Sequence, residues 1–418
     1  MSKFVIHGGR PLSGVIDVAA NKNAVLPMMA AALLTDQDCV LENVPAIADV
    51  TTMSQIMRDL GAIVEELPGR RLRLNCAGVN SDHPPESLVE RMRASVILMG
   101  PLLARHGHVN MHHPGGDAIG YRSIGTHVHA FERLGVDVRP DKDLYRACVG
   151  GRPSDRTIFL DEASVTATEN IMLYAAARPG VTTVRNAASE PHVENLALML
   201  NGMGAQIEGA GSNVLHIRGA TLSGTSATVW PDHAESGTFA ALAAAGRGTV
   251  TIRNIIPEHL DMVLLILDRM GVDFSLGEGV MEVRPSELRA VSKIQTGIWP
   301  AFPTDLASIY IVLATQARGM TLVHDWMYEG RMFFIDRLVQ MGARIVLADP
   351  HRAVISGPSP LRGREMPTPD IRAGIALVMA ALIAEGVSEI EHAELIDRGY
   401  ERIDERLQAL GADIQRVA

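Results

Sequence analysis

Basic residues stand at the start of several segments that we expect to form buried helices. Lys22, Arg93 and Arg372 each fall in the polar turn that opens an apolar, alanine-rich run. A helix N-terminus has free N–H groups and a partial positive charge, so it attracts anions and disfavours cations. A phosphate or carboxylate ligand would compensate for these cations. We therefore predict a site for small anions here, and we interpret Glu235 and Ser236 at a similar turn as ordinary capping residues.

One loop combines reactive groups with glycine. Residues 112–122 read His-His-Pro-Gly-Gly-Asp-Ala-Ile-Gly-Tyr-Arg. The Pro-Gly-Gly turn interrupts helix and strand alike, and it puts the carboxylate of Asp117 at the tip with the guanidinium of Arg122 five residues later. Such a loop suits a mobile substrate lid, because glycine allows close backbone approach and movement. An ordinary connecting loop is the alternative.

A pattern that recurs six times must position these residues. Each copy has a strand ending in Asn or His, an amphipathic helix and a glycine, and a glycine directly after a helix predicts a C-cap. The strand-end residues are Asn43, His112, Asn186, Asn254, His324 and His392, and the glycines are Gly61, Gly135, Gly204, Gly271, Gly342 and Gly411. Successive glycines are 74, 69, 67, 71 and 69 residues apart. This period is too long for a common solenoid, so two domains of three repeats are expected.

A second, almost uncharged helix precedes each of these strands, and a helix that is apolar all round is buried on all sides. The expected buried helices are 23–34, 94–104, 167–177, 237–245, 306–315 and 371–384. We predict one domain over 22–230 and a second from 1–21 plus 231–418. From strand-end residue to glycine takes 17 to 19 residues in five repeats but 23 in the second, where Pro114–Asp117 lies. An insertion confined to one repeat favours a functional loop.

Composition narrows the classes of function. The 418 residues are 47% hydrophobic with a net charge of −10, which argues against a nucleic-acid surface. Three scattered cysteines, no signal-peptide pattern and no apolar run long enough for a membrane span favour a cytoplasmic protein. We expect no metal, because the spacing of His106, His108, His112, His113, His127 and His129 matches no standard site. We expect no cofactor, because no P-loop or convincing dinucleotide fingerprint is present.

Several motifs together resemble the enolpyruvyl transferases over essentially the whole chain, and within them the branch that acts on UDP-N-acetylglucosamine. The matching stretches are 8–14 (Gly-Gly-Arg-Pro-Leu-Ser-Gly), 21–27 (Asn-Lys-Asn-Ala-Val-Leu-Pro), 93–95 (Arg-Ala-Ser), 114–116 (Pro-Gly-Gly), 302–305 (Phe-Pro-Thr-Asp) and 396–402 (Ile-Asp-Arg-Gly-Tyr-Glu-Arg). The resemblance implies a two-domain inside-out α/β barrel with six βαβαββ repeats, three per domain, that closes over its substrates.

The resemblance also implies a reaction. Enolpyruvyl moves from phosphoenolpyruvate to the 3-hydroxyl of UDP-N-acetylglucosamine, and phosphate leaves, as the first committed step of peptidoglycan synthesis. The implied catalytic residues are Asp305 as base near the hydroxyl, Asp117 and Lys22. Lys22, Arg122 and Arg398 would hold the phosphate region, Arg331 and Arg372 the carboxylate, and Asn23 and Arg93 would position substrates. The remaining implied substrate-binding residues are Ser123, Ile124, Gly125, Thr126, His127, Ser164, Val165, Met327 and Asp370.

Three positions depart from the family's usual pattern. Asp117 stands where most relatives have cysteine, so a carboxyl that is protonated by desolvation or by a nearby anion would replace the thiol as proton donor or aid product release. Insensitivity to fosfomycin, which alkylates that thiol, follows. Gly125 and Thr166 replace an Asp and a Gly where uracil and diphosphate would bind. An enolpyruvyl transferase for another nucleotide or sugar acceptor, and a non-catalytic nucleotide-sugar sensor, are the alternatives.

Overall fold

The computed structural model describes residues 2–117, 119–141, 144–151 and 156–417. The chain forms two compact units, each with its own hydrophobic core. Unit 1 comprises the described residues of Met1–Ala19, Ala118–Tyr121 and Pro231–Ala418, and unit 2 those of Ala20–Asp117 and Arg122–Trp230. Within the described residues, no helix is long and apolar enough to cross a membrane.

Unit 1 contains three four-stranded sheets, with strand orders β21-β22-β1-β23, β15-β16-β14-β2 and β17-β18-β20-β19. Its strands are β1 (Lys3–His7), β2 (Gly14–Asp17), β14 (Val250–Arg253), β15 (Asp273–Gly277), β16 (Val280–Arg284), β17 (Lys293–Gln295), β18 (Gly319–His324), β19 (Arg344–Asp349), β20 (Arg352–Gly357), β21 (Glu365–Pro367), β22 (Val387–Glu391) and β23 (Asp413–Val417). Each sheet joins one parallel strand pair to antiparallel neighbours. The N-terminal strands β1 and β2 therefore complete two sheets whose other strands come from the C-terminal half.

Unit 2 also has three sheets among its described residues, with orders β13-β3-β5-β4, β11-β12-β10-β9 and β6-β8-β7. Its strands are β3 (Cys39–Glu42), β4 (Ile63–Leu67), β5 (Arg71–Asn75), β6 (His108–His112), β7 (Val136–Pro140), β8 (Leu144–Val149), β9 (Thr157–Phe159), β10 (Gly180–Arg185), β11 (Gln206–Glu208), β12 (Val214–Gly219) and β13 (Ser226–Thr228). Here β13, the last strand of the unit, pairs in parallel with β3, the first. The chain thus closes this unit on itself.

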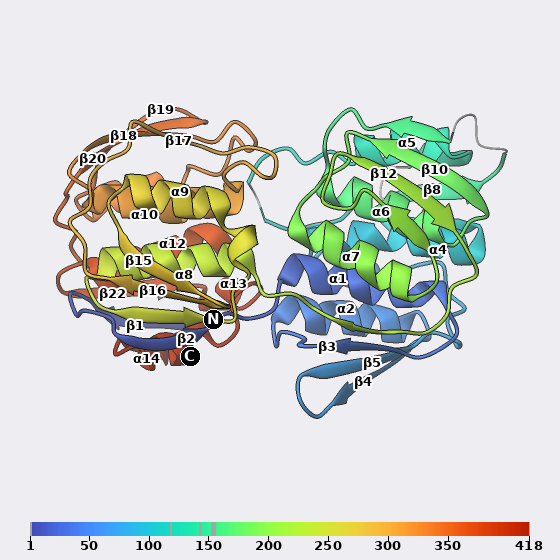
Figure 1. Ribbon diagram of the computed structural model, residues 1–418, viewed down its shortest axis with the longest axis horizontal. Coiled ribbons are helices and arrows are strands. Elements are labelled where there is room, and N and C mark those ends of the chain that lie inside the picture. The colour runs from blue at the N-terminus through green and yellow to red at the C-terminus, as the bar shows by residue number, and fades with distance from the viewer. Residues whose placement is uncertain (1, 118, 142–143, 152–155, 418) are drawn as a thin grey trace. The chain divides into compact units, whose positions relative to one another are not determined.

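The apolar helices lie inside each unit and the sheets lie outside (Figure 1). In unit 1 the inner helices are α8 (His233–Gly246), η4 (Thr304–Leu306) with α10 (Ala307–Gln316), and α12 (Ile371–Ile383). In unit 2 they are α1 (Lys22–Ala31) with η1 (Ala32–Leu34), η2 (Arg93–Leu98) with α4 (Met99–His106), and α6 (Val165–Ala176). All six expected buried helices are present, although 93–98 is a 3₁₀ turn.

The amphipathic helices are shorter in unit 1. They are α2 (Ala48–Asp59), α3 (Glu86–Val89), α5 (Gly125–Arg133), α7 (Pro191–Gly202), η3 (Pro257–His259), α9 (Asp261–Arg269), α11 (Ile335–Gln340), α13 (Ala393–Ile396) and α14 (Ile403–Gln408). In unit 2, α2, α5 and α7 pack against the inner helices α1 and α6. The architecture is the predicted inside-out α/β fold. The exact domain limits, 22–230 and 1–21 plus 231–418, stay a prediction.

The strand-end asparagines have a definite structural task. Asn43, Asn186 and Asn254 adopt φ near +59°, a left-handed conformation that asparagine tolerates better than most residues. The Nδ2 of each donates to the carbonyl that follows the parallel partner strand: Val229 after β13, Leu160 after β9 and Val18 after β2, at 2.7 to 2.9 Å. The recurring residue therefore ties two parallel strands together where the chain turns toward its surface helix. The six repeat glycines all have positive φ, as a helix C-cap requires.

Candidate active site

In unit 1, two buried arginines hold one carboxylate. Asp305 lies in η4 at the start of the α10 helix. Its Oδ2 accepts from Arg372 Nη2 at 2.8 Å and its Oδ1 accepts from Arg331 Nη2 at 3.2 Å. Arg331 and Arg372 are only 3% and 6% exposed, respectively, whereas the Asp305 side chain is 29% exposed. The carboxylate therefore reaches solvent while its cationic partners lie behind it, which suits a base that must meet a substrate hydroxyl.

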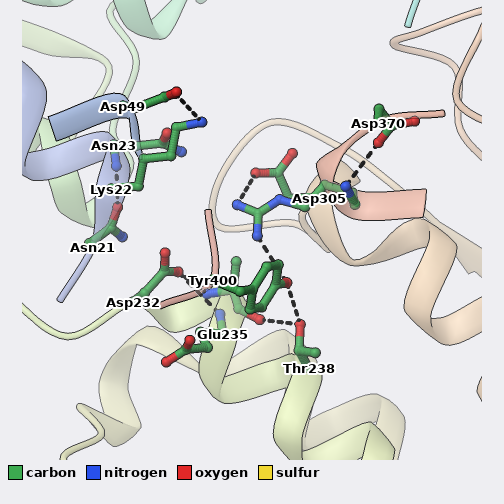
Figure 2. Close-up of polar contacts among 12 residues, drawn as sticks. Asn21, Lys22, Asn23, Asp49, Asp232, Glu235, Thr238, Asp305, Asp370 and Tyr400 are labelled. Atoms are coloured by element: carbon green, nitrogen blue, oxygen red, sulfur yellow. Dashed lines mark hydrogen bonds and ion pairs between the residues drawn. The ribbon is translucent and has the colours of Figure 1, made fainter. Parts of the chain in front are cut away.

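Arg372 is anchored on its other side by Tyr400, whose own contact with Thr238 is drawn in Figure 2. Its Nη1 donates to the hydroxyl of Tyr400 at 3.0 Å, and that hydroxyl lies 3.0 Å from Thr238 Oγ1 on α8. Thr238 donates to the carbonyl of Ala234, so the tyrosine hydroxyl must donate to Thr238. Burial alone would lower the pKa of Arg372, but attraction to Asp305 and Tyr400 outweighs it and raises that pKa well above its ordinary value. The guanidinium is permanently charged and fixed in direction.

The position of Arg372 follows from a helix cap. Asp370 Oδ1 accepts from the backbone N–H groups of Arg372 and Ala373 at 2.8 and 3.0 Å, so it caps α12. From the sequence we expected an anionic ligand to supply the negative charge near Arg372. In the structure the carboxylate of Asp305 supplies a negative charge there. Asp370, predicted to bind substrate, is itself buried and acts as this cap. Met327, from the same prediction, is half-buried in the turn that leads to Arg331.

The first helix of unit 2 presents Lys22 in a similar way (Figure 2). Asn21 caps α1 through its Oδ1, which accepts from the N–H groups of Asn23 and Ala24. Lys22 Nζ lies 2.7 Å from Asp49 Oδ2 on α2, and the two side chains are 14% and 4% exposed. A protein carboxylate again balances a cation at a helix start. Lys22 and Asn23 lie in unit 2, whereas Asp305, Arg331, Arg372 and Arg398 lie in unit 1.

The Pro-Gly-Gly loop needs both of its glycines. A Cβ on Gly115 would lie 1.6 Å from the carbonyl oxygen of Glu90, and one on Gly116, where φ is +115°, would lie 2.9 Å from Cβ of Arg93. The loop therefore rests directly on the backbone that leads into η2. Arg93 in turn donates to the carbonyl of Ser123 at 2.9 Å, which joins the start of η2 to the start of α5. Asp117 follows at the half-buried loop tip.

The predicted nucleotide-binding residues lie at the starts of α5 and α6. His127 is 1% exposed, and its ring bridges the two helices: Nε2 is 3.0 Å from Thr166 Oγ1, and Nδ1 is 3.0 Å from Asn170 Nδ2. Burial and, less strongly, Arg93 lower the pKa of His127 to about 3, so the ring is neutral. Thr126 donates to Asp161 at 2.7 Å. Both side chains therefore position α5 rather than facing solvent, and Thr166 supplies a partner that the family's usual glycine lacks.

The other predicted residues divide by exposure. Ser123 and Gly125 are exposed, and the Gly125 N–H donates to Ser123 Oγ at 2.9 Å in the turn before α5. Ile124 is buried. Arg122, Val165 and Arg398 are half-buried, as is Ser164, which caps α6.

Sequence reasoning missed Asp325 and Thr238. Asp325 directly follows the strand-end residue His324, and that position was the only signal that could have marked it.

Comparison with known proteins agrees with this geometry over the full chain. The family model of EPSP synthase (3-phosphoshikimate 1-carboxyvinyltransferase) matches residues 6–407. The chain belongs to this family. The UDP-N-acetylglucosamine 1-carboxyvinyltransferase of Bradyrhizobium diazoefficiens is 47% identical, with 99% of this chain and 98% of the relative covered. The enzyme of that name from Treponema denticola is 44% identical, with 99% of each chain covered.

A solved structure supports the same assignment. The enolpyruvyl transferase NikO from Streptomyces tendae has a TM-score of 0.90 at 25% identity, covering 100% of this chain and 99% of its own. The predicted enolpyruvyl transferase and its fold are therefore confirmed. The individual site residues stay predictions, since the family assignment does not test them.

Proposed function

We propose that this enolpyruvyl transferase uses phosphoenolpyruvate to modify the 3-hydroxyl of UDP-N-acetylglucosamine. The observation that carries the proposal is the carboxylate of Asp305, half-exposed in front of two buried guanidinium groups, in a chain 47% identical to an enzyme named for this reaction. The acceptor comes from the names of the full-length relatives. The product would enter peptidoglycan synthesis. The three cysteines, none of which forms a disulfide, fit a cytoplasmic location.

The reaction divides into an addition and an elimination. In the addition, Asp305 takes the proton of the 3-hydroxyl, the hydroxyl oxygen bonds to C2 of phosphoenolpyruvate, and C3 gains a proton to become a methyl group. Asp117 is our candidate for the donor of that proton. In the elimination, the methyl group returns a proton and the C2–O bond to phosphate breaks, which leaves the enolpyruvyl ether and inorganic phosphate. No cofactor enters this balance.

Fixed cations stabilise the charge on both anionic groups of phosphoenolpyruvate. We assign its phosphate to Lys22, Arg122 and Arg398, and its carboxylate to Arg331 and Arg372. Because Arg372 is held by Tyr400 and Arg331 is buried, their charge needs no reorganisation when substrate binds. Ser123 to His127 and Ser164 with Val165 provide the helix starts that we assign to the nucleotide, because a helix N-terminus attracts anions such as its diphosphate.

A phosphate-release assay tests the proposal. Purified protein with phosphoenolpyruvate is offered UDP-N-acetylglucosamine, UMP or shikimate 3-phosphate, and Asp305→Asn serves as the inactive control. We expect release only with UDP-N-acetylglucosamine. Release with a different acceptor would give the protein another biosynthetic role. Phosphoenolpyruvate stable with every acceptor, together with binding of the nucleotide sugar, would instead indicate a sensor.

A further inference from the structure

Asp325 is a fully buried carboxylate that gathers three hydrogen bonds next to the candidate base. Its Oδ1 accepts from Thr296 Oγ1 at 2.9 Å and from the Met327 N–H at 3.0 Å, and its Oδ2 accepts from Thr304 Oγ1 at 2.5 Å. Its exposed fraction is 0%. A buried carboxylate is tolerated when it is hydrogen-bonded and balanced by charge, and here three donors and the nearby guanidinium of Arg331 meet both conditions.

Two of its contacts lead directly to Asp305 and Arg331. Thr304 is the residue before Asp305 in η4, so its short bond to Asp325 fixes the backbone that carries the base. Arg331 Nε lies 3.9 Å from Asp325 Oδ2, is buried, and has no hydrogen-bond partner among the described residues. The Nη2 atom of the same guanidinium reaches Asp305. Arg331 thus lies between the carboxylates of Asp305 and Asp325, with its Nε edge toward the buried Asp325.

We propose that Asp325 is a positioning residue for the transfer reaction, an inference that rests on the proposed function. It holds η4 through Thr304, and its negative charge turns the Nε edge of Arg331 inward so that the Nη atoms face Asp305 and the substrate carboxylate. Asp325 contacts no substrate itself. Asp325 therefore positions both the base Asp305 and the cation Arg331, so its replacement would misalign both at once.

Asp325→Asn tests this role, with Asp404→Asn as the matched control. Asp404 is also buried and also accepts from a guanidinium, that of Arg416, and within the described part of the chain it has no hydrogen bond or ion pair with a residue assigned to the reaction. We expect Asp325→Asn to lower kcat/KM for phosphoenolpyruvate by about 100-fold, the usual cost of a misplacement near 1 Å. The KM for phosphoenolpyruvate should rise more than the KM for the acceptor. Asp404→Asn should lower the melting temperature without changing either constant.

A second pair of variants keeps the test usable if Asp325→Asn does not fold. Thr304→Val removes the hydroxyl that joins Asp325 to η4, whereas Thr304→Ser keeps it, so the serine variant should recover much of the kcat that the valine variant loses. Normal kcat/KM in Asp325→Asn, or equal losses in the valine and serine variants, would overturn the proposal. A parent enzyme that releases no phosphate would instead refute the proposed function, so the two failures are distinguishable.

Discussion

Replacing Glu190 with glutamine should stabilise unit 2 in a pH-dependent way. Glu190 precedes α7, and its Oε2 is buried with no hydrogen-bond partner among the described residues. Burial raises its pKa from 4.5 to about 7, although its own backbone N–H and that of Ser189 partly oppose the shift. The neighbouring Glu169 on α6 is also buried, and burial and, less strongly, the charge of Glu190 raise its pKa well above the ordinary value.

The sign and size of the effect follow from the raised pKa. A carboxyl whose folded-state pKa exceeds its unfolded value binds its proton more tightly in the folded state. Its stabilising contribution is complete below pH 4.5, and it is lost as the pH rises through 7. A shift of this size corresponds to about 3 kcal/mol in the free energy of unfolding. Glutamine keeps the neutral shape, so the variant should avoid that loss and melt about 5–10 °C higher at pH 8.

Differential scanning calorimetry between pH 4 and 8 measures this difference. The melting temperatures of parent and Glu190→Gln should agree near pH 4 and separate steadily up to pH 7, then run parallel. Glu208→Gln, at an exposed position on β11 of the same unit, is the control and should follow the parent throughout. A gap that is constant with pH, or a variant that is less stable than the parent at pH 8, would refute the argument from burial.

Three further predictions concern the reaction. Asp117→Cys should become sensitive to fosfomycin while the parent is not, as measured by residual phosphate release after incubation; rapid inactivation of the parent would contradict this. Asp305→Asn should lower kcat by a factor of about 10²–10⁴, as expected for loss of a general base, and unchanged turnover would exclude Asp305 from that role. Thr166→Gly removes the partner of His127 and should destabilise the protein by about 1–3 kcal/mol in urea titration, and a neutral result would show that the bridge between α5 and α6 is dispensable.

The repeats were predictable because each rests on a local backbone demand. Glycine after a surface helix and asparagine at a strand end both mark left-handed backbone, and few other residues tolerate it. Likewise, an alanine-rich helix without charges has to be buried wherever it lies. These are properties of short stretches, so they could be read without knowing the tertiary structure.

The partners of the candidate site were not predictable in the same way. Arg372 was expected to await an anion, but Asp305, 67 residues earlier in the chain, already pairs with it. His127 stays a predicted substrate-binding residue, but the sequence did not reveal that its ring contacts Thr166 and Asn170 of another helix. Both outcomes depend on contacts between distant segments, which no local pattern encodes. Asp325 was missed for the same reason, because two of its three donors, Thr296 and Thr304, lie 29 and 21 residues earlier in the chain.

The places of the paired strands in the sequence set the order in which the two units can fold during synthesis on the ribosome. Unit 2 is formed by a nearly continuous segment of the chain that ends at Trp230. Its sheets can therefore be completed as soon as β13 has been synthesised. The strands β1 and β2 are made before their partners β14, β22 and β23. Until those partners are made, β1 and β2 have unpaired edges, which favour chaperone binding and mispairing.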